Sequence, residues 1–241
     1  MAPPVDRRLE WDGCFNVRDL GGHVTLGGRR TRFGVVARSD ARERLTEGGW
    51  ASLRAHGVST IVDLRDPSEH GRGFASLPGV ELVEIPILDL GDDEFWGDGR
   101  WRGNEHSRDF YVAVLERWPG RFAAAVARVA DAGAGAILVH CQAGRDRTGL
   151  LVAALLTLVG VGPESIAEDY AASEASLQPL YDEWMRDASD ERQRARIRRA
   201  NTSDPEVMLG VLASVDLPEL LLSQGLTLED VAKLRARLVE S

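Results

Sequence analysis

Short apolar runs alternate along this chain with longer segments in which apolar residues recur at helical spacing. The short runs are typical of strands and lie at residues 35–37, 58–64, 80–88 and 136–139. The longer segments are typical of helices and lie at residues 45–56, 108–117, 120–132, 150–159, 165–173, 180–199, 204–215 and 228–239. This alternation predicts an α/β fold with a central, mainly parallel sheet flanked by helices, with helical insertions. Because no repeat or linker divides the chain, we expect one domain over residues 1–241.

The composition is that of a globular chain with an acidic balance. Its 241 residues carry a formal net charge of −9, which argues against nonspecific binding to nucleic acid or to an anionic membrane. The first residues contain no apolar signal segment, and the longest apolar run, residues 150–159, is far shorter than the roughly 20 residues of a membrane-spanning helix. We therefore expect a cytoplasmic protein with no stable membrane insertion.

The strongest chemical signal is the stretch from His140 to Gly149, which joins an apolar strand to a long apolar helix through a tight loop. In such a loop the backbone amides form a nest of donors at the helix N-terminus, a site suited to phosphate. Cys141 lies where the strand ends and Arg147 where the helix begins. The helix end, His140 and Arg147 are expected to lower the thiol pKa and make Cys141 a nucleophile.

Other interpretations of this loop exist. Cys141 alone would be read as a buried core thiol. A Walker A loop and a dinucleotide fingerprint are excluded because their glycine and lysine patterns are missing. Sulfur transfer or arsenate reduction gives no reason for Asp146 and Thr148, and a noncatalytic phosphate-binding module would not need every catalytic position filled.

The string His-Cys-x5-Arg-Thr-Gly resembles the signature of the cysteine-dependent protein tyrosine phosphatase superfamily. Its fuller form is similar to the Ala-Gly-Lys-Asp-Arg-Thr-Gly loop of bacterial tyrosine and phosphoinositide phosphatases, with Arg145 in place of the usual lysine. The segment Asn-x-Arg-Asp-Leu-Gly-Gly at residues 16–22 is similar to the opening motif of the same subfamily. The residues of this motif, Arg18 and Asp19 among them, are expected to fix the loop rather than to react.

This reading predicts phosphate-monoester hydrolysis through a phosphocysteine intermediate, on a phosphorylated protein or a phosphoinositide. Cys141 attacks phosphorus, Thr148 hydrogen-bonds the sulfur and His140 orients the loop. No metal or cofactor is required, because loop amides and one guanidinium supply the positive charge. The residues expected to bind the phosphate are Gln142, Ala143, Gly144, Arg145, Asp146 and Arg147.

The general acid is not given by the loop signature, because no Asp follows Trp118-Pro119. Pro119 is instead expected to open a helix. Asp146 and Asp63 are the candidates for the acid, and Asp146 is preferred because it lies beside Arg147; its alternative role is to cap the following helix. Ligands bind at the carboxyl ends of parallel strands, so Arg38, Asp63 and Arg65 are further candidates for the site, or else form ion pairs.

Two segments and one residue keep open interpretations. Residues 89–104 form either a lid or a surface excursion whose two tryptophans pack on the body. Residues 180–199 form a helix whose arginines are either a solvated face or a basic cap over the active site. Cys14 is either a small core residue or a redox partner of Cys141.

Overall fold

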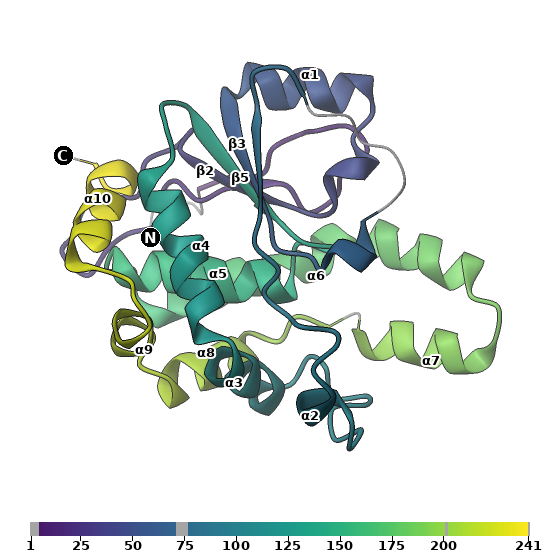
Figure 1. Cartoon of the computed structure of the whole chain (residues 1–241). Helices are drawn as coiled ribbons and strands as arrows, with labels where there is room; N and C mark the ends of the chain where they lie inside the picture. The colour runs from purple at the N-terminus through teal and green to yellow at the C-terminus, as the bar shows by residue number, and fades with distance from the viewer. Residues whose placement is uncertain (1–4, 71–76, 201, 241) are drawn as a thin grey trace.

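The computed structural model describes residues 5–70, 77–200 and 202–240, and a five-stranded sheet with the order β1-β2-β5-β3-β4 lies at its centre (Figure 1). All neighbouring strands are parallel except β1, which pairs with β2 in the antiparallel sense. The α/β fold with a mainly parallel sheet is thus confirmed. The strands are β1 Arg18–Asp19, β2 Val36–Ser39, β3 Val58–Asp63, β4 Glu81–Glu84 and β5 Ala136–His140.

Helices cover both faces of the sheet (Figure 1). The α-helices are α1 Glu47–Ala55, α2 Asp93–Trp96, α3 Arg108–Arg117, α4 Pro119–Asp131, α5 Asp146–Leu158, α6 Pro163–Asp187, α7 Glu191–Ala200, α8 Pro205–Ser214, α9 Leu217–Ser223 and α10 Leu228–Leu238. Two short 3-10 helices are η1 Arg42–Arg44 and η2 Pro67–Glu69. Over the described ranges, no helix is long and apolar enough to cross a membrane.

Successive residues of the central strand β5 point to opposite faces of the sheet. Leu138 packs in the apolar cluster with residues of α1, whereas Ile137 and Val139 pack in the larger cluster that contains α4 and α5. Since both faces of a parallel sheet are covered by helices, its strands read as continuous apolar runs rather than as alternating ones. This explains why the pattern at 136–139 predicts a buried strand.

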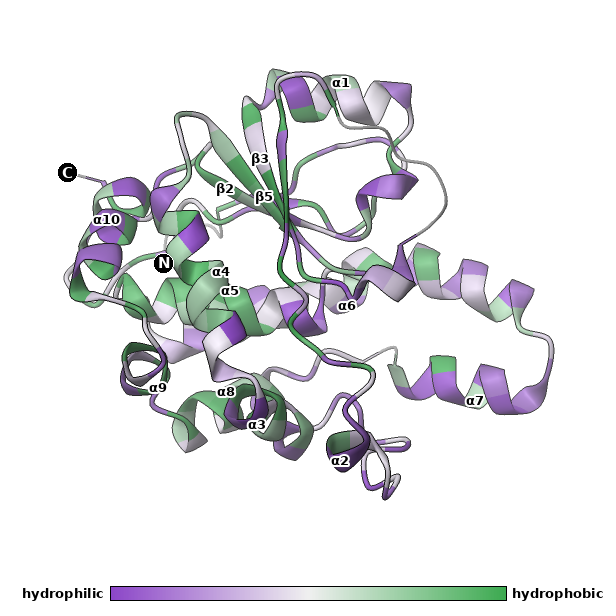
Figure 2. Ribbon diagram, viewed as in Figure 1, coloured by the Kyte–Doolittle hydropathy of each residue, from purple (hydrophilic) through white to green (hydrophobic). Residues whose placement is uncertain are grey.

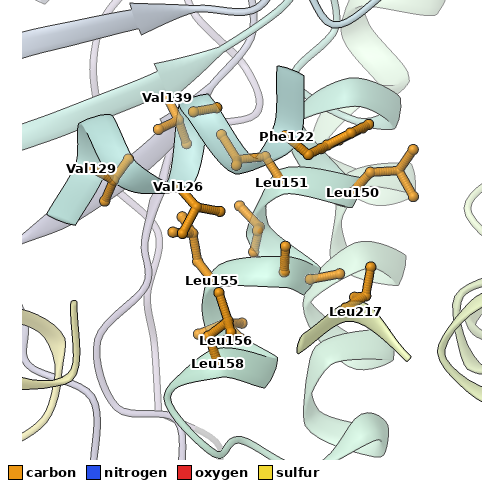
Figure 3. Packing of buried hydrophobic residues seen from close by; sticks show 14 of the residues in the cluster. Phe122, Val126, Val129, Val139, Leu150, Leu151, Leu155, Leu156, Leu158 and Leu217 are labelled. Atoms are coloured by element: carbon orange, nitrogen blue, oxygen red, sulfur yellow. The ribbon is translucent and has the colours of Figure 1, made fainter. Parts of the chain in front are cut away.

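Helix α5 is buried on nearly every side, and all its residues from 148 to 158 except Thr157 are buried. In Figure 3, Leu151 and Leu155 of this helix lie against Phe122 and Val126 of α4. Truncation of such a buried leucine to alanine costs about 2–5 kcal/mol of unfolding free energy. The start of α5, and with it the loop before it, is therefore held firmly against the sheet.

The segment predicted as one helix over residues 180–199 is divided, and this prediction was wrong in its boundaries. Helix α6 ends at Asp187, and α7 begins at Glu191. The physical reason is a new helix start, because the Asp190 carboxylate accepts a hydrogen bond of 2.7 Å from the backbone N–H of Gln193. Pro119 is the first residue of α4, as predicted.

Residues 89–104 contain the short helix α2 and are fixed to the body by an aromatic cluster. Phe95 is buried, and its ring centroid lies 5.6 Å from that of Trp101 and 4.6 Å from that of Trp118. The Trp96 indole N–H donates to the carbonyl oxygen of Asp89 at 2.7 Å. In this structure residues 89–104 therefore form a surface excursion whose tryptophans pack on the body, one of the two interpretations that the sequence allowed.

Candidate active site

The loop from Cys141 to Arg145 connects β5 to α5 at the carboxyl ends of the parallel strands. Gly144 has a positive φ of 65°, a conformation that residues with a side chain rarely adopt. A Cβ atom built on it would lie 2.2 Å from the carbonyl oxygen of Ser39. Only glycine fits here, so the sharp turn of the loop depends on this residue.

Side chains outside the loop hold its carbonyl oxygens. The Asn16 amide donates to the carbonyl oxygens of Ala143 at 3.0 Å and Gly144 at 3.1 Å, and the Arg38 guanidinium donates to that of Gly144 at 2.5 Å. The carbonyl oxygen of Gln142 accepts from the backbone N–H of Ala41 at 3.1 Å. Because the C=O and N–H of a peptide unit point in opposite directions, carbonyls held outside leave amide donors directed inside the loop.

The residues that hold the loop are themselves fixed by the buried carboxylate of Asp169 on α6. Asp169 accepts from Arg18 at 2.8 Å and from Arg38 at 2.5 Å. Burial would raise the pKa of Asp169, but Arg18 and Arg38 outweigh it and keep that pKa well below its usual range. Arg18 also donates to the Asn16 side chain at 2.5 Å, so the opening motif supports the loop from behind, as expected.

Cys141 lies in a cavity of about 460 Å³ between the loop and the α6–α7 segment. The cavity joins residues from the loop, from η2, from the segment before α3 and from both helices. It is lined by Glu69, His106, Cys141, Gln142, Ala143, Arg145, Asp146, Arg147, Tyr181, Trp184, Asp187, Gln193, Arg196, Ile197 and Ala200. In the described part of the chain, the predicted candidates Arg38, Asp63 and Arg65 are not among the lining residues.

Arg147 shares the cavity with Cys141 and pairs with Glu69, donating to both carboxylate oxygens, one of them at 2.8 Å. Burial opposes the charge of Arg147, but the nearby Cys141 and Glu69 outweigh it and raise the pKa of Arg147. Glu69 was missed in the sequence. The pattern Asp-Pro-Ser-Glu, which is typical of a capping box, could have indicated its position. In this capping box Glu69 also accepts a hydrogen bond of 2.9 Å from the backbone N–H of Asp66.

Thr148 lies in the first turn of α5 and is fully buried. Within the described residues its hydroxyl oxygen has no hydrogen-bond partner. A buried hydroxyl without a partner costs about 1–3 kcal/mol. This hydroxyl is therefore available to a group that enters the loop.

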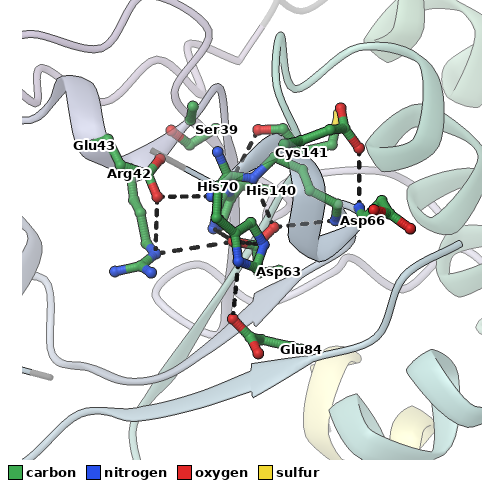
Figure 4. A network of polar contacts seen from close by, with 12 residues as sticks. Ser39, Arg42, Glu43, Asp63, Asp66, His70, Glu84, His140 and Cys141 are labelled. Carbon is green, nitrogen blue, oxygen red and sulfur yellow. Dashed lines mark hydrogen bonds and ion pairs between the residues drawn. The ribbon is translucent and has the colours of Figure 1, made fainter. Parts of the chain in front are cut away.

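His140 and Asp63 belong to a buried polar network beneath the loop (Figure 4). Nδ1 of His140 lies 3.2 Å from the carbonyl oxygen of Cys141, and Nε2 lies 3.4 Å from an Asp63 carboxylate oxygen. Asp63 also accepts from Arg65 at 2.6 Å, and Arg65 donates to Glu43 at 2.7 Å. Arg65 and Asp63 thus form a supporting ion pair, the alternative that the sequence left open for them.

The expected charge of His140 is corrected by its burial. Burial lowers the pKa of His140 to about 4, so the imidazole is neutral near pH 7 and adds no positive charge beside the thiol. Because a carbonyl oxygen only accepts, Nδ1 of His140 carries the proton and donates to the backbone of Cys141. The geometry fits the predicted role of His140 in orienting the loop.

The Arg145 side chain turns away from the loop interior and towards the helices. It donates to the Tyr181 hydroxyl at 2.7 Å and to the carbonyl oxygens of Ala200 and, at 3.3 Å, Thr202. It is almost completely buried. The guanidinium at this position therefore serves to attach the loop to the α6–α7 segment.

The Asp146 carboxylate lies at the mouth of the loop and is bonded by three side chains. It accepts from the Tyr111 hydroxyl and from Arg145 at 3.1 Å, and Nδ1 of His106 lies 3.0 Å from the same carboxylate oxygen. Burial would raise the pKa of Asp146, but Arg145 and His106 outweigh it and keep that pKa well below its usual range. Since these bonds go to side chains, Asp146 does not cap its own helix. Tyr111 and His106 were not predicted, because nothing in the sequence places them near residue 146.

Cys14 is held apart from this chemistry. Its thiol lies 3.6 Å from the carbonyl oxygen of Ala41 and packs beside the apolar cluster under α1, whereas Cys141 belongs to the larger cluster. Burial and the neighbouring Asp40 raise the pKa of Cys14. These surroundings match the core-residue interpretation. Within residues 5–70, 77–200 and 202–240, no three His, Cys, Asp or Glu side chains come together as metal ligands.

Fold and site together define a cysteine-dependent phosphatase, with a nucleophile after a parallel strand and an arginine at the next helix N-terminus. Residues 9–240 match the model of the tyrosine phosphatase family, and the chain belongs to that family. The predicted enzyme class is confirmed. Among solved structures, Pseudomonas aeruginosa TpbA is similar at 16% identity and a TM-score of 0.38, over 79% of this chain and 86% of that one.

Three named relatives are similar to much of the chain. The triple specificity protein phosphatase PtpB of Mycobacterium tuberculosis is 30% identical over 199 residues, which cover 71% of each protein. A putative tyrosine-protein phosphatase of Cupriavidus necator is 32% identical over 68% of this chain and 62% of its own length. A tyrosine-protein phosphatase of Nostoc commune is 30% identical over 56% of this chain and 47% of its own length.

Proposed function

We propose that this phosphatase hydrolyses phosphate monoesters through a phosphocysteine intermediate and acts mainly on phosphotyrosine. The observation that carries the proposal is the loop itself, in which Cys141 and Arg147 share one cavity while Asn16 and Arg38 hold the loop carbonyls outside. Amides so directed bind the three equatorial phosphate oxygens and stabilise the charge that develops on them. This arrangement suits transfer of a phosphoryl group to the thiolate better than any other reaction.

In the first step the Cys141 sulfur bonds to phosphorus while the bond from phosphorus to the ester oxygen breaks. The Arg147 guanidinium holds two of the oxygens, and Glu69 fixes its orientation. Asp146 gives its proton to the leaving oxygen. Asp146 is ionised in the free enzyme, but a bound phosphate dianion beside the carboxylate favours its protonated form.

In the second step a water molecule attacks phosphorus, and Asp146 takes its proton. The bond between phosphorus and sulfur breaks, and the electron pair returns to Cys141. The buried hydroxyl of Thr148 has no other partner among the described residues, so it donates to the departing thiolate. His140 holds the backbone of Cys141 throughout.

The cavity walls support an aromatic substrate. Tyr181, Trp184 and Ile197 line the side that faces the loop, and an aromatic and apolar wall suits the phenyl ring of phosphotyrosine. Phosphoserine, phosphothreonine and phosphoinositides are proposed as further substrates, in keeping with the name of the M. tuberculosis relative as a triple specificity phosphatase.

The test is a substrate panel on the purified protein with the Cys141→Ser variant beside it. Wild type should hydrolyse para-nitrophenyl phosphate and phosphotyrosine peptides, keep its activity in EDTA and be inhibited by vanadate. Cys141→Ser should lose turnover but still bind phosphate, because the amides and Arg147 remain while the sulfur nucleophile is gone. Turnover by Cys141→Ser near the wild-type rate would remove the covalent mechanism.

A further inference from the structure

A second cavity, of about 810 Å³, adjoins the catalytic cavity along α7. Four arginines line it, together with two carboxylates: Arg102, Arg192, Arg196, Arg199, Glu105 and Asp190. Gln193 and Arg196 line both cavities. The two spaces are therefore neighbours that share part of a wall.

The two carboxylates are engaged by the backbone. Glu105 accepts from the N–H of Gly103 at 2.8 Å, and Asp190 accepts from the N–H of Gln193 at 2.7 Å. Neither carboxylate forms an ion pair with an arginine of the cavity in the described part of the chain. The arginines thus keep their charge for another anion.

The arginines of α7 fall into two groups. Arg198 is paired with Glu191, and Arg194 donates to the carbonyl oxygen of Ala188 at 3.1 Å. For the four arginines of the second cavity, the structure records no hydrogen bond or ion pair of the side chain with any described residue. The unpaired arginines of α7 in the described residues are thus the ones that line the second cavity, and the two with partners, Arg194 and Arg198, are not among its lining residues.

This concentration of positive charge has a cost. Residues three and four apart lie on one face of a helix, and like charges there repel each other. Arg192, Arg196 and Arg199 have that spacing, in a chain whose net charge is −9. In Figure 2, α7 is almost entirely hydrophilic, while its one buried apolar residue, Ile197, lines the catalytic cavity. An anion bound between these guanidinium groups would remove the repulsion.

We propose that the second cavity binds a second phosphate group of a peptide substrate while Cys141 attacks its phosphotyrosine. This rests on the proposed function. The aromatic wall of the catalytic cavity takes the phenyl ring, and the shared residue Arg196 places the second anion close to it. In an extended peptide, side chains two residues apart point the same way and are about 6–7 Å apart, and the planar guanidinium group binds phosphate through two parallel hydrogen bonds. The substrate class is thus a segment with two phosphorylated residues close together.

The experiment compares two peptides that both contain one phosphotyrosine and differ at a single position, two residues away from it. At that position the peptide called singly charged has serine, and the peptide called doubly charged has a nonhydrolysable phosphonate analogue of phosphoserine. The measured quantity is the ratio of kcat/KM for the doubly charged peptide to that for the singly charged one. Wild type should prefer the doubly charged peptide about tenfold, because a hydrogen bond to a charged group contributes about 1.5–3 kcal/mol. The preference should shrink as salt is raised.

The double variant Arg192→Gln/Arg199→Gln should bring this ratio close to one. Arg198→Gln is the matched control, since it removes a charge from the same helix outside the cavity, and it should keep the wild-type ratio. A wild-type ratio near one would overturn the proposal, and so would an equal loss in the control. Hydrolysis of the singly charged peptide tests the proposed function separately.

A soluble phosphoinositide with two ring phosphates distinguishes the other source of a second phosphate. If the double variant loses activity on this lipid but keeps the wild-type ratio on the peptides, the cavity serves a headgroup and the peptide assignment is overturned. If the double variant instead loses the preference for the doubly charged peptide and keeps wild-type thermal stability, the peptide assignment is supported.

Discussion

The Arg145 guanidinium and the Tyr181 hydroxyl are 2.7 Å apart, and this hydrogen bond joins the phosphate-binding loop to helix α6. The same guanidinium reaches the carbonyl oxygen of Ala200 at the end of α7. Both elements of the α6–α7 segment therefore meet the loop through one side chain. Because the catalytic cavity lies between the loop and the α6–α7 segment, its shape depends on Arg145.

This relationship predicts that Arg145 acts on all substrates alike. Arg145→Ala should lower the thermal midpoint and reduce kcat/KM by similar factors for para-nitrophenyl phosphate and for a soluble phosphoinositide. Removing one partner of a buried charged network costs about 3–5 kcal/mol of unfolding free energy. A much larger loss on the phosphoinositide would mean that Arg145 binds a second anionic group of the substrate directly.

A second prediction concerns the support of the loop by Asn16. Asn16→Ala removes the two hydrogen bonds to the carbonyl oxygens of Ala143 and Gly144, so these peptide units can turn and withdraw amides from the phosphate. Vanadate affinity should fall about tenfold or more, since each lost buried partner costs about 1–3 kcal/mol. Asn104→Ala, at an exposed asparagine outside the cavities, is the control. Unchanged vanadate affinity in Asn16→Ala would show that the loop holds its shape without this side chain.

The sequence predicted the parts of the site that are contiguous in the chain. The loop from His140 to Thr148 could be recognised because one strand end and one helix start determine its geometry. His106 and Tyr111 could not, because they reach the loop only after the chain has folded. The capping-box pattern could indicate the turn that contains Glu69, but not its contact with Arg147. The prediction that His140 is positively charged was wrong for a related reason. The burial of this side chain depends on the elements packed around it and not on its neighbours in sequence.

The third prediction is a pH dependence of stability that comes from His140. Burial lowers its pKa to about 4 in the folded protein, against about 6.5 in an unfolded chain. The unfolded state therefore binds the proton more tightly, and the free energy of unfolding should decrease as the pH falls from about 6.5 to about 4. This difference between the folded and unfolded pKa values of His140 corresponds to roughly 3 kcal/mol of unfolding free energy. Urea denaturation at several pH values measures it, and His140→Gln should show a shallower dependence. Parallel curves for the two proteins would contradict the neutral, buried state of this imidazole.

The last prediction assigns the general acid. Asp146 lines the catalytic cavity, whereas Asp63 is bonded to Arg65 beneath the loop, outside the residues that line this cavity in the described part of the chain. A positioned acid typically contributes about 10²- to 10⁴-fold, and its effect is greatest for poor leaving groups. Asp146→Asn should therefore slow an alkyl phosphate far more than para-nitrophenyl phosphate and flatten the alkaline limb of the pH profile. Asp63→Asn should lower stability and slow both substrates equally, because it weakens the buried ion pair with Arg65 beneath the loop. If only Asp63→Asn shows the dependence on the leaving group, the acid is Asp63.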